Sequence, residues 1–357
     1  MTETTMRAAV MHGRGDIRIE NVPVPFARPG ELLLEVSTVG ICGTDAHEWA
    51  HGPKLFPLEA PHPVTGHVGP MIIGHEFAGY VRAVGERVDP EWTGKLVASC
   101  GSMACGVCEE CATGRSNLCR RYASVGLHRD GALASFVSAP VASCVDVGVL
   151  GLGSEEAALV QPMAIAVHSM KRSGISPRDV AIVQGVGGIG AFLIWALIQS
   201  GAEVVAVDLQ QERLDVARKL GAHVTILGGQ PSSQEAIVAT FGERIPVFVE
   251  VTGSDHGLNL AIEIVPMGTN IVMVGIHKVP RPVDLSRITV RELSLIGTNA
   301  LVRETDFPEA AALVSLRRGQ WGDIAPTPRT LDELVEGALR PMSEGHPPAI
   351  KTLIRPV

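Results

Sequence analysis

The chain has 357 residues, of which 46% are hydrophobic and 19% are charged, and its formal net charge is −8. This length and composition predict two folded domains with sizeable cores and exclude a disordered chain. The acidic balance disfavours nucleic acid as a partner. No segment has the pattern of a secretory signal or a membrane span, so we expect a cytoplasmic protein with no membrane partner.

The N-terminal part of the chain is predicted to be rich in β-strands. Residues 6–12, 17–24 and 31–40 form short apolar or alternating runs between turn-forming residues. We expect this β-rich character to continue to residue 150 with no sustained helical period. The pattern changes at 155–174, where apolar residues recur with helical spacing.

From residue 180 onward, predicted strands and helices alternate. This pattern is typical of a parallel sheet with helices on both faces. Mixed helix and a last strand at 350–356 follow from about residue 305. The alternating elements are expected as strands at 179–185, 203–208, 247–253, 269–277 and 292–298, and as helices at 191–201, 211–222 and 256–265.

Four cysteines in the segment ACGVCEECATGRSNLC have the spacing of a metal site. Cys105, Cys108 and Cys111 are each separated by two residues, and Cys119 follows eight positions later. Four thiolates suit tetrahedral Zn²⁺, whereas two disulfides are the alternative. The chain lacks a secretory signal and has an odd number of cysteines, seven, so zinc is favoured. A site closed by four ligands is structural.

A glycine motif after the strand at 179–185 predicts a dinucleotide site. Gly185, Gly187 and Gly190 form G-x-G-x-x-G at the start of the next predicted helix. In this context the glycines allow a tight turn, approach to a pyrophosphate and close helix–strand packing. We expect Gly188 and Ile189 to contact the cofactor as well.

Asp208 ends the next predicted strand, eighteen residues after Gly190. Its carboxylate is placed to bind a ribose 2′-hydroxyl and would repel a 2′-phosphate, which favours NAD over NADP. The alternative role for Asp208 is a helix cap. Arg213 is either a contact to the adenosine end of the cofactor or a solvated helix residue.

The order of the motifs GICGTD, GHEFAG, the four-cysteine segment, Gln161-Pro162 and GVGGIG resembles the zinc-containing medium-chain dehydrogenases. The resemblance covers nearly the whole chain. It implies an α/β protein with a β-rich GroES-like catalytic domain, a Rossmann domain with a doubly wound parallel sheet, and an active site in the cleft between them. The expected domains are 1–156, with a zinc lobe near 100–120, then 157–301, and a return to the catalytic domain at 302–357.

The resemblance also assigns roles around a second, catalytic zinc. Cys42 and His75 match its ligands, and Glu76 matches an acidic residue that binds the ion or exchanges with water. Asp45 matches a carboxylate that orients the histidine. Thr44 matches the hydroxyl that starts a proton relay, and His47 matches its exit to solvent, although His47 is otherwise an ordinary loop histidine.

One position departs from the resembled pattern. Relatives carry a Glu-Pro pair where this chain has Gln161-Pro162. Glutamine is neutral and a poor zinc ligand, so either water or Glu76 is expected to complete the metal shell. We therefore expect Gln161 to orient water or substrate at the metal.

The substrate class follows from the segment between the expected ligands. Residues 51–70 contain five prolines and three histidines, and this long form resembles the (R,R)-2,3-butanediol dehydrogenase branch. We therefore expect a vicinal diol, with polyols such as sorbitol or xylitol, threonine and simple secondary alcohols as alternatives. The loop is expected to form a lid or wall of the substrate pocket. Its histidines, His51, His62 and His67, are either polar loop residues or a further metal site.

Two expectations concern the protein as a whole. A non-catalytic NAD-binding scaffold is the alternative from another class, but the intact Cys42 and His75 pair argues against it. Relatives form homodimers or homotetramers by pairing sheet edges, and 269–277 and 293–300 are the candidate edge segments.

Overall fold

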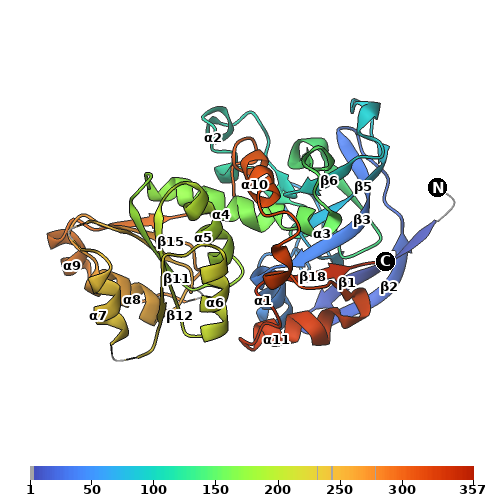
Figure 1. The fold of residues 1–357 in the computed structure, drawn as a ribbon. Coiled ribbons are helices and arrows are strands. Elements are labelled where there is room, and N and C mark those ends of the chain that lie inside the picture. The colour runs from blue at the N-terminus through green and yellow to red at the C-terminus, as the bar shows by residue number, and fades with distance from the viewer. Residues whose placement is uncertain (1–3, 231, 243, 278) are drawn as a thin grey trace. The chain divides into compact units, whose positions relative to one another are not determined.

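The computed structural model describes residues 4–230, 232–242, 244–277 and 279–357 (Figure 1). The described chain forms two compact units. The first combines the residues up to Gln161 with those from Val302 onward, and the second runs from Pro162 to Leu301. We expected the first boundary after residue 156, whereas the units divide inside helix α4 (Val160–Ser173).

The first unit consists mainly of antiparallel strands. Its main sheet has the order β10-β6-β5-β3-β18-β17, with β9 also paired to β3, and β2-β1-β4 and β7-β8 form smaller sheets. In the central β3, residues 32–34 and Val36 are apolar and pack into a core with Phe77 and Leu133. The strands are β1 (Thr5–Gly13), β2 (Asp16–Pro23), β3 (Glu31–Ile41), β4 (Met71–Ile72), β5 (Glu76–Val84), β6 (Leu96–Ser99), β7 (Ser102–Met103), β8 (Ala123–Ser124), β9 (Phe136–Pro140), β10 (Cys144–Asp146), β17 (Arg329–Thr330) and β18 (Thr352–Arg355).

Helix α1 (Gly43–His51) corrects the expectation that the first 150 residues lack sustained helix. It begins directly after β3, with Cys42 as the residue before its first turn. The backbone N–H of Cys42 donates to Asp45 Oδ2 at 2.9 Å, which satisfies a donor at the helix start. The other helices of this unit are α2 (Glu109–Ala112), α3 (Ser154–Ala157), α10 (Asp306–Ser315) and α11 (Arg340–Ser343). It also has 3₁₀ turns at Pro90–Trp92, Ser116–Leu118, Val141–Ser143, Gly148–Leu150, Trp321–Asp323 and Leu331–Glu333 and a π turn at Val335–Leu339.

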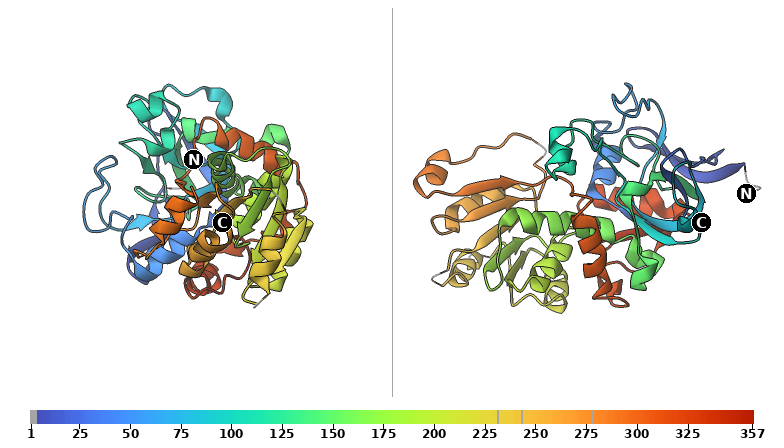
Figure 2. Two further views of the ribbon diagram at one scale, coloured as in Figure 1. Left: turned by 90° about the vertical axis from the view of Figure 1, so that its left-hand side faces the viewer. Right: turned by 90° about the horizontal axis from the view of Figure 1, so that it is seen from above.

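The second unit is a parallel sheet with helices on both faces, as expected (Figure 2). The strand order β13-β12-β11-β14-β15-β16 places the reversal of winding between β11 and β14. Strand β11 is buried along its whole length, because helices cover both sides of the sheet. The elements are β11 (Val180–Gln184), α5 (Gly190–Gln199), β12 (Glu203–Asp208), α6 (Gln211–Lys219), β13 (Val224–Leu227), α7 (Ser233–Ala239), β14 (Val247–Glu250), α8 (Asp255–Ile264), β15 (Asn270–Met273), α9 (Leu285–Val290) and β16 (Ser294–Gly297).

The sheet order corrects one expectation about the edge strands. The segment 269–277 contains β15, which pairs with both β14 and β16 and so is not an edge. The segment 293–300 contains β16, which is the last strand of the order. Of the two candidates, only β16 therefore has an unpaired side among the described residues. In the described part of the chain, no helix is both long and apolar enough to cross a membrane.

Candidate metal centres and dinucleotide site

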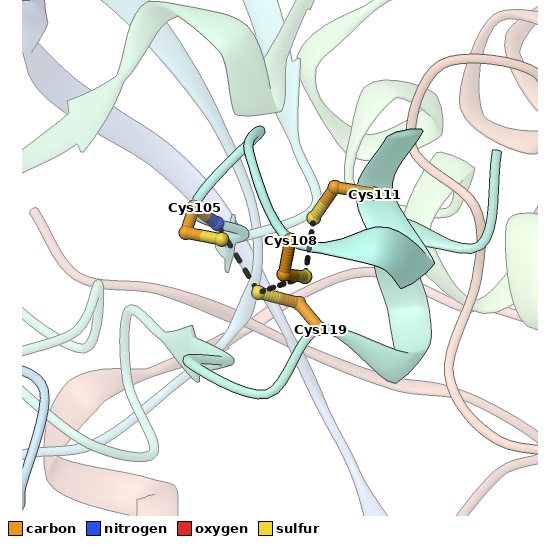
Figure 3. A group of neighbouring side chains, drawn as sticks. All are labelled: Cys105, Cys108, Cys111 and Cys119. Carbon is orange, nitrogen blue, oxygen red and sulfur yellow. Dashed lines mark hydrogen bonds between the residues drawn. The ribbon is translucent and has the colours of Figure 1, made fainter. Parts of the chain in front are cut away.

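The four lobe cysteines converge on one point in the first unit (Figure 3). Their sulfur atoms all lie within 4.8 Å of one another, and Cys108 Sγ is 3.5 Å from Cys111 Sγ and 3.8 Å from Cys119 Sγ. These distances are too long for a disulfide bond, and each of the seven cysteines is a free thiol. A cluster of four sulfur donors at this spacing fits Zn²⁺.

Backbone donors support a negative charge on two of the lobe sulfurs, those of Cys105 and Cys119, whereas burial and the neighbouring thiols raise the pKa of Cys111 to about 12. Backbone N–H groups of Val107 and Cys108 donate to the Cys105 sulfur and lower its pKa to about 6. The backbone N–H of Cys105 donates in turn to Cys119 Sγ at 3.2 Å. By contrast, burial raises the pKa of Cys100 to about 12 and that of Cys144 to about 11. Those two thiols lie outside both metal clusters and are protonated core residues.

A second cluster brings together the three residues expected at the catalytic zinc. One ligand atom each from Cys42, His75 and Glu76 lies within 4.8 Å of the others. Cys42 precedes α1, His75 immediately precedes β5, and Glu76 is the first residue of β5. His75 and Glu76 are buried, and Cys42 is half-buried. Thiolate, imidazole and carboxylate are all ligands that zinc accepts.

Asp45 links the two expected ligands of this cluster. Its Oδ2 accepts the backbone N–H of Cys42, and its Oδ1 lies 3.3 Å from His75 Nδ1. The carboxylate is fully buried, so it stays in place, and it leaves His75 Nε2 as the nitrogen that faces a metal. Burial lowers the pKa of His75, but the interactions with Asp45 and Cys42 together outweigh it, and the pKa is raised.

The two expected relay residues stand on α1 with Asp45. Thr44 Oγ1 lies 3.6 Å from Cys42 Sγ, which places its hydroxyl beside the metal cluster. His47 follows one turn later, and its ring centroid lies 5.1 Å from that of His51. Helix α1 thus carries the hydroxyl of Thr44 and the imidazole of His47 about one turn apart. The resemblance already indicated these two residues, although the helix itself was not predicted.

Lys351 is a residue of this site that the sequence analysis missed. Its Nζ donates to both carboxylate oxygens of Glu76, at 2.7 and 3.0 Å, and to the carbonyl oxygen of Ile41 at 3.3 Å. Both side chains are buried. Burial lowers the pKa of Lys351, but Glu76, Cys42 and Asp45 together outweigh it, and the pKa is raised. The only sequence signal was a lysine inside an apolar strand pattern.

Gln161 is buried at the end of the first unit. Its Oε1 is inaccessible to solvent and has no hydrogen-bond partner among the described residues. A buried amide oxygen without a donor is costly unless a ligand or water satisfies it. This unpartnered oxygen therefore fits a residue that accepts a hydrogen bond from a bound substrate or water molecule.

The proline-rich loop packs against residues 122–131. The rings of His62 and His128 stack with centroids 4.4 Å apart, and Thr65 Oγ1 donates to the carbonyl oxygen of His128 at 2.6 Å. In the described chain, His51, His62 and His67 do not form a metal-binding group. Residues 64–67 line a cavity of about 790 Å³ whose described lining includes no residue of the Cys42 cluster.

The glycine motif adopts the conformation that its spacing predicts. Gly185 has a φ of 101°, which favours glycine, and a Cβ on Gly190 would overlap the carbonyl oxygen of Gly185. A Cβ on Gly187 would have open space around it, as a position facing a ligand requires. The motif thus leads directly from β11 into the N-terminus of α5, and this cradle fits a pyrophosphate.

Asp208 lies at the end of β12, beside the glycine motif. Its Oδ2 accepts the backbone N–H of Val186 at 2.7 Å, and its Oδ1 accepts that of Gln210 at 3.0 Å. Arg213 on α6 places Nη1 3.7 Å from Asp208 Oδ2, so it is an ion-pair partner of that carboxylate and not a fully solvated residue. The structure thus brings together the residues predicted for the adenosine end.

Comparisons with known proteins agree with this geometry. The family model for the alcohol dehydrogenase GroES-like domain matches residues 28–148, and that for zinc-binding dehydrogenase matches residues 188–315. The chain is 32% identical to (R,R)-butanediol dehydrogenase of Neisseria gonorrhoeae, over 98% of this chain and 99% of that one. It is also 32% identical to sorbitol dehydrogenase of Bacillus subtilis, over 83% and 84%.

The fold comparison gives the same family. The crystal structure of 2R,3R-butanediol dehydrogenase from Bacillus subtilis matches with a TM-score of 0.89 and 30% identity, over 99% of this chain and 100% of that one. This agreement confirms the two-domain fold and excludes the non-catalytic scaffold. The chain therefore belongs to the zinc-containing medium-chain dehydrogenase/reductase superfamily, as an alcohol or polyol dehydrogenase that uses zinc and a nicotinamide cofactor.

Proposed function

We propose that this protein oxidises one secondary alcohol of a vicinal diol, such as 2,3-butanediol, to the hydroxyketone, reversibly and with NAD. The observation that carries the proposal is the arrangement of Cys42 and His75 around one buried carboxylate, Asp45. It occurs in a chain similar over nearly its whole length to a butanediol dehydrogenase. The proline-rich segment 51–70 supports the diol, because its length and pattern resemble that branch.

The roles of the residues follow from their chemistry. When bound, zinc supplies the Lewis acidity that favours loss of the alcohol proton, and NAD accepts the hydride. Cys42 and His75 would hold the metal, and Asp45 fixes their orientation. Thr44 would take up the alcohol proton as it gives its own hydroxyl proton onward toward His47, and His47 would pass a proton to solvent.

Gln161 is proposed to orient the substrate or a water molecule at the metal without binding the metal itself. Its buried Oε1, which lacks a described partner, supports this role. In Gln161→Ala we expect kcat/KM to fall while zinc content stays the same. A variant with unchanged zinc content and unchanged turnover would show that this glutamine does nothing at the site.

The alternative substrates are sorbitol-like polyols, threonine and simple secondary alcohols. Similarity to a sorbitol dehydrogenase supports a polyol as the alternative substrate. The deciding experiment measures NAD reduction with the stereoisomers of 2,3-butanediol and with sorbitol, xylitol, threonine and 2-butanol. We expect the highest kcat/KM with one butanediol stereoisomer. Activity confined to sorbitol or threonine would remove the diol assignment.

We also propose a cytoplasmic homo-oligomer. A thiolate zinc site requires reduced cysteines, which favours a reducing compartment. Strand β16 has an unpaired side among the described residues, and pairing of two copies at this edge would extend the sheet. Light scattering coupled to size exclusion is expected to give a dimer or tetramer, and a monomer at working concentration would contradict this.

A further inference from the structure

Helix α1 carries a second buried carboxylate besides Asp45. Glu48 is 1% exposed, and its charge is held by the backbone of the segment that follows the helix. Its Oε2 accepts the N–H groups of Lys54, Leu55 and Phe56, at 2.7, 3.0 and 3.4 Å. Consecutive N–H groups that point at one oxygen form an anion-binding nest. Glu48 therefore fixes the first residues of the proline-rich segment.

Gly52 lets the chain fold back over this carboxylate. Its N–H donates to the carbonyl oxygen of Glu48 at 2.9 Å. A Cβ at position 52 would lie 2.5 Å from that carbonyl oxygen and 2.8 Å from Glu48 Oε2. Gly52 has a φ of −82°, so the backbone conformation does not require glycine. The missing side chain instead leaves room for the carboxylate, and we call Glu48, Gly52 and residues 54–56 the Glu48 anchor.

The anchor holds the near end of the segment in place. In the described chain, residues 52–70 contain no helix or strand, and the N–H groups of residues 54–56 have Glu48 as their only described acceptor. Phe56 adds an apolar contact, because it is 4% exposed and packs in the core of the first unit. Without the carboxylate, three N–H groups would lose their acceptor, which costs free energy wherever water does not replace it.

The far end of the segment is held separately. Thr65 Oγ1 donates to the carbonyl oxygen of His128 at 2.6 Å. Residues 64–67 line the cavity whose described lining includes no residue of the Cys42 cluster. The segment is thus fixed at both ends, and only its near part, residues 52–58, directly follows helix α1.

We propose that Glu48 is a positioning residue that makes the near part of this segment a fixed wall of the substrate pocket instead of a mobile lid. The inference rests on the proposed function and on the expectation that the segment borders the substrate pocket. Glu48 directly follows His47 on the helix that also carries Thr44. The anchor thus ties residues 52–58 to the same helix as the proposed proton relay, and it acts on the substrate only through those residues.

Opening of the segment at the anchor would be unfavourable for two reasons. The three N–H groups would leave their shared acceptor, and the Glu48 carboxylate would remain buried without the donors that hold its charge. A buried charge that loses its hydrogen-bond partners is more costly than a neutral group in the same place. A lid needs an open state of low free energy, whereas this segment has one strongly favoured conformation. The wall therefore limits the size of the alcohol by its fixed shape.

Hydrogen exchange in the purified wild-type protein tests the wall against the lid. We expect the amides of residues 54–56 to exchange slowly in the free protein. The rate is expected to be the same with NADH and 2,3-butanediol bound, a pair that cannot react with each other. Exchange that is fast in the free protein, and slows by about tenfold or more when both ligands are present, would identify a lid and overturn the proposal.

Three variants test the anchor itself. Lys54 is exposed, so trypsin can cut after it once the backbone there is released. In Glu48→Ala we expect this cleavage to be faster by about tenfold or more, because the N–H groups have lost their acceptor. Glu48→Gln keeps a carbonyl oxygen for them and is expected to be cut at close to the wild-type rate. Glu59→Ala is the matched control, because Glu59 is an exposed carboxylate of the same segment.

The substrate readout distinguishes a wall from a general effect on folding. In Glu48→Ala we expect the KM for 2,3-butanediol to rise by about tenfold with kcat little changed, since the loosened wall holds the small diol less well. The kcat/KM for sorbitol relative to that for 2,3-butanediol is expected to rise, because a mobile wall admits a longer chain. The Kd of NADH is expected to stay the same, since the glycine motif belongs to the second unit. Glu48→Gln is expected to restore the wild-type values.

The outcomes separate this inference from the proposed function. If Glu48→Ala is cut at Lys54 at the wild-type rate, the anchor is wrong and the proposed function stands. If it is cut faster but the KM and the substrate ratio stay the same, the inference fails, while NAD reduction by the diol in the wild type still upholds the proposed function. If Glu48→Ala does not fold, hydrogen exchange in the wild type decides. If the wild type oxidises none of the alcohols, the proposed function and the inference both fail.

Discussion

At the scale of single residues, Asp45 organises the catalytic cluster. It accepts the Cys42 backbone N–H with one oxygen and faces His75 with the other. A carboxylate shared between two ligands couples the start of a helix to the start of a strand. The pairing of β3 with β5, at Gly40 and Glu76, brings the ligands close together although they are far apart in the sequence.

Asp45→Asn tests this coupling. The amide keeps the size of the side chain but removes the charge that faces His75, so the ligand is oriented less firmly. Zinc affinity at the Cys42 site is expected to fall by about 10- to 100-fold, as is usual for partners of metal ligands. Chelator competition measures it. Asp332→Asn is the matched control, because that carboxylate pairs with Arg7 at the surface. Equal affinities in the two variants would contradict the role of Asp45.

Asp208 gives a second prediction at the residue scale. In Asp208→Asn an acceptor for the Val186 N–H remains, whereas the charge that would repel a 2′-phosphate is lost. Arg213 also loses its ion-pair partner and becomes available to a phosphate. We expect the preference for NADH over NADPH to fall by about tenfold or more. Fluorescence titration with both cofactors measures it, and an unchanged ratio of dissociation constants would show that Asp208 does not set the preference.

At the scale of elements, the stacked rings of His62 and His128 join the proline-rich loop to residues 122–131. Both Nδ1 atoms accept backbone N–H groups, that of His62 from Val64 and that of His128 from Ser124. The Nδ1 atom of each ring therefore carries no hydrogen. Burial and the nearby imidazoles lower the pKa of His128 to about 4, and burial lowers that of His62.

This contact predicts a loss of stability in acid. Because the pKa of His128 is lower in the folded state, the unfolded chain binds more protons between about pH 6.5 and pH 4. The free energy of unfolding therefore falls as the pH drops through that window, by about 1 kcal/mol from this group after allowance for its partial exposure. His128→Asn keeps an acceptor for the Ser124 N–H but does not titrate, so its urea midpoint is expected to fall less between pH 7 and pH 5. Equal falls in both proteins would contradict this.

Elements and sites differed in how far the sequence predicted them. Most strands after residue 180 and the helices α5, α6 and α8 followed from their regular alternation, whereas α7 and α9 were not predicted. The glycine motif followed from its position between β11 and α5. Helix α1 was missed because Ala46, Trp49 and Ala50 are its apolar residues, too few to show a helical period. Strand β13 was also missed, since it has four residues and only one of them is buried.

Lys351 shows why part of the site could not be predicted from the sequence. Its partner Glu76 lies 275 positions away in the chain, and only the pairing of β18 with β3 brings the two together. No local pattern encodes such a contact. The four cysteines were predictable for the opposite reason, because all four ligands lie within one short segment.

At the scale of the whole molecule, the four-cysteine lobe also supports the C-terminal return of the chain. Ser116 lies in the turn between Cys111 and Cys119, and its Oγ donates to Glu304 Oε2 at 2.6 Å. Glu304 stands two residues after the chain re-enters the first unit at Val302. The lobe thus contacts the segment through which the chain returns.

Cys119→Ser tests the lobe at this scale. We expect the variant to lose one zinc per chain and to unfold at a lower temperature, because the lobe and its contact with Glu304 lose their support. Cys100→Ala is the matched control, since that thiol is buried outside both clusters and should leave the zinc content unchanged. Calorimetry with metal analysis measures both effects. A Cys119→Ser protein that keeps the zinc of the control would contradict the assignment of the lobe.

The most direct test of the central claim is the zinc content of the purified wild-type chain, measured by mass spectrometry of the metal. Four thiolates in the lobe and the Cys42–His75 cluster predict two zinc ions per chain. The second ion is expected to disappear in Cys42→Ser together with NAD reduction by the diol. A wild-type protein that holds one zinc ion per chain and still oxidises the diol would contradict the account.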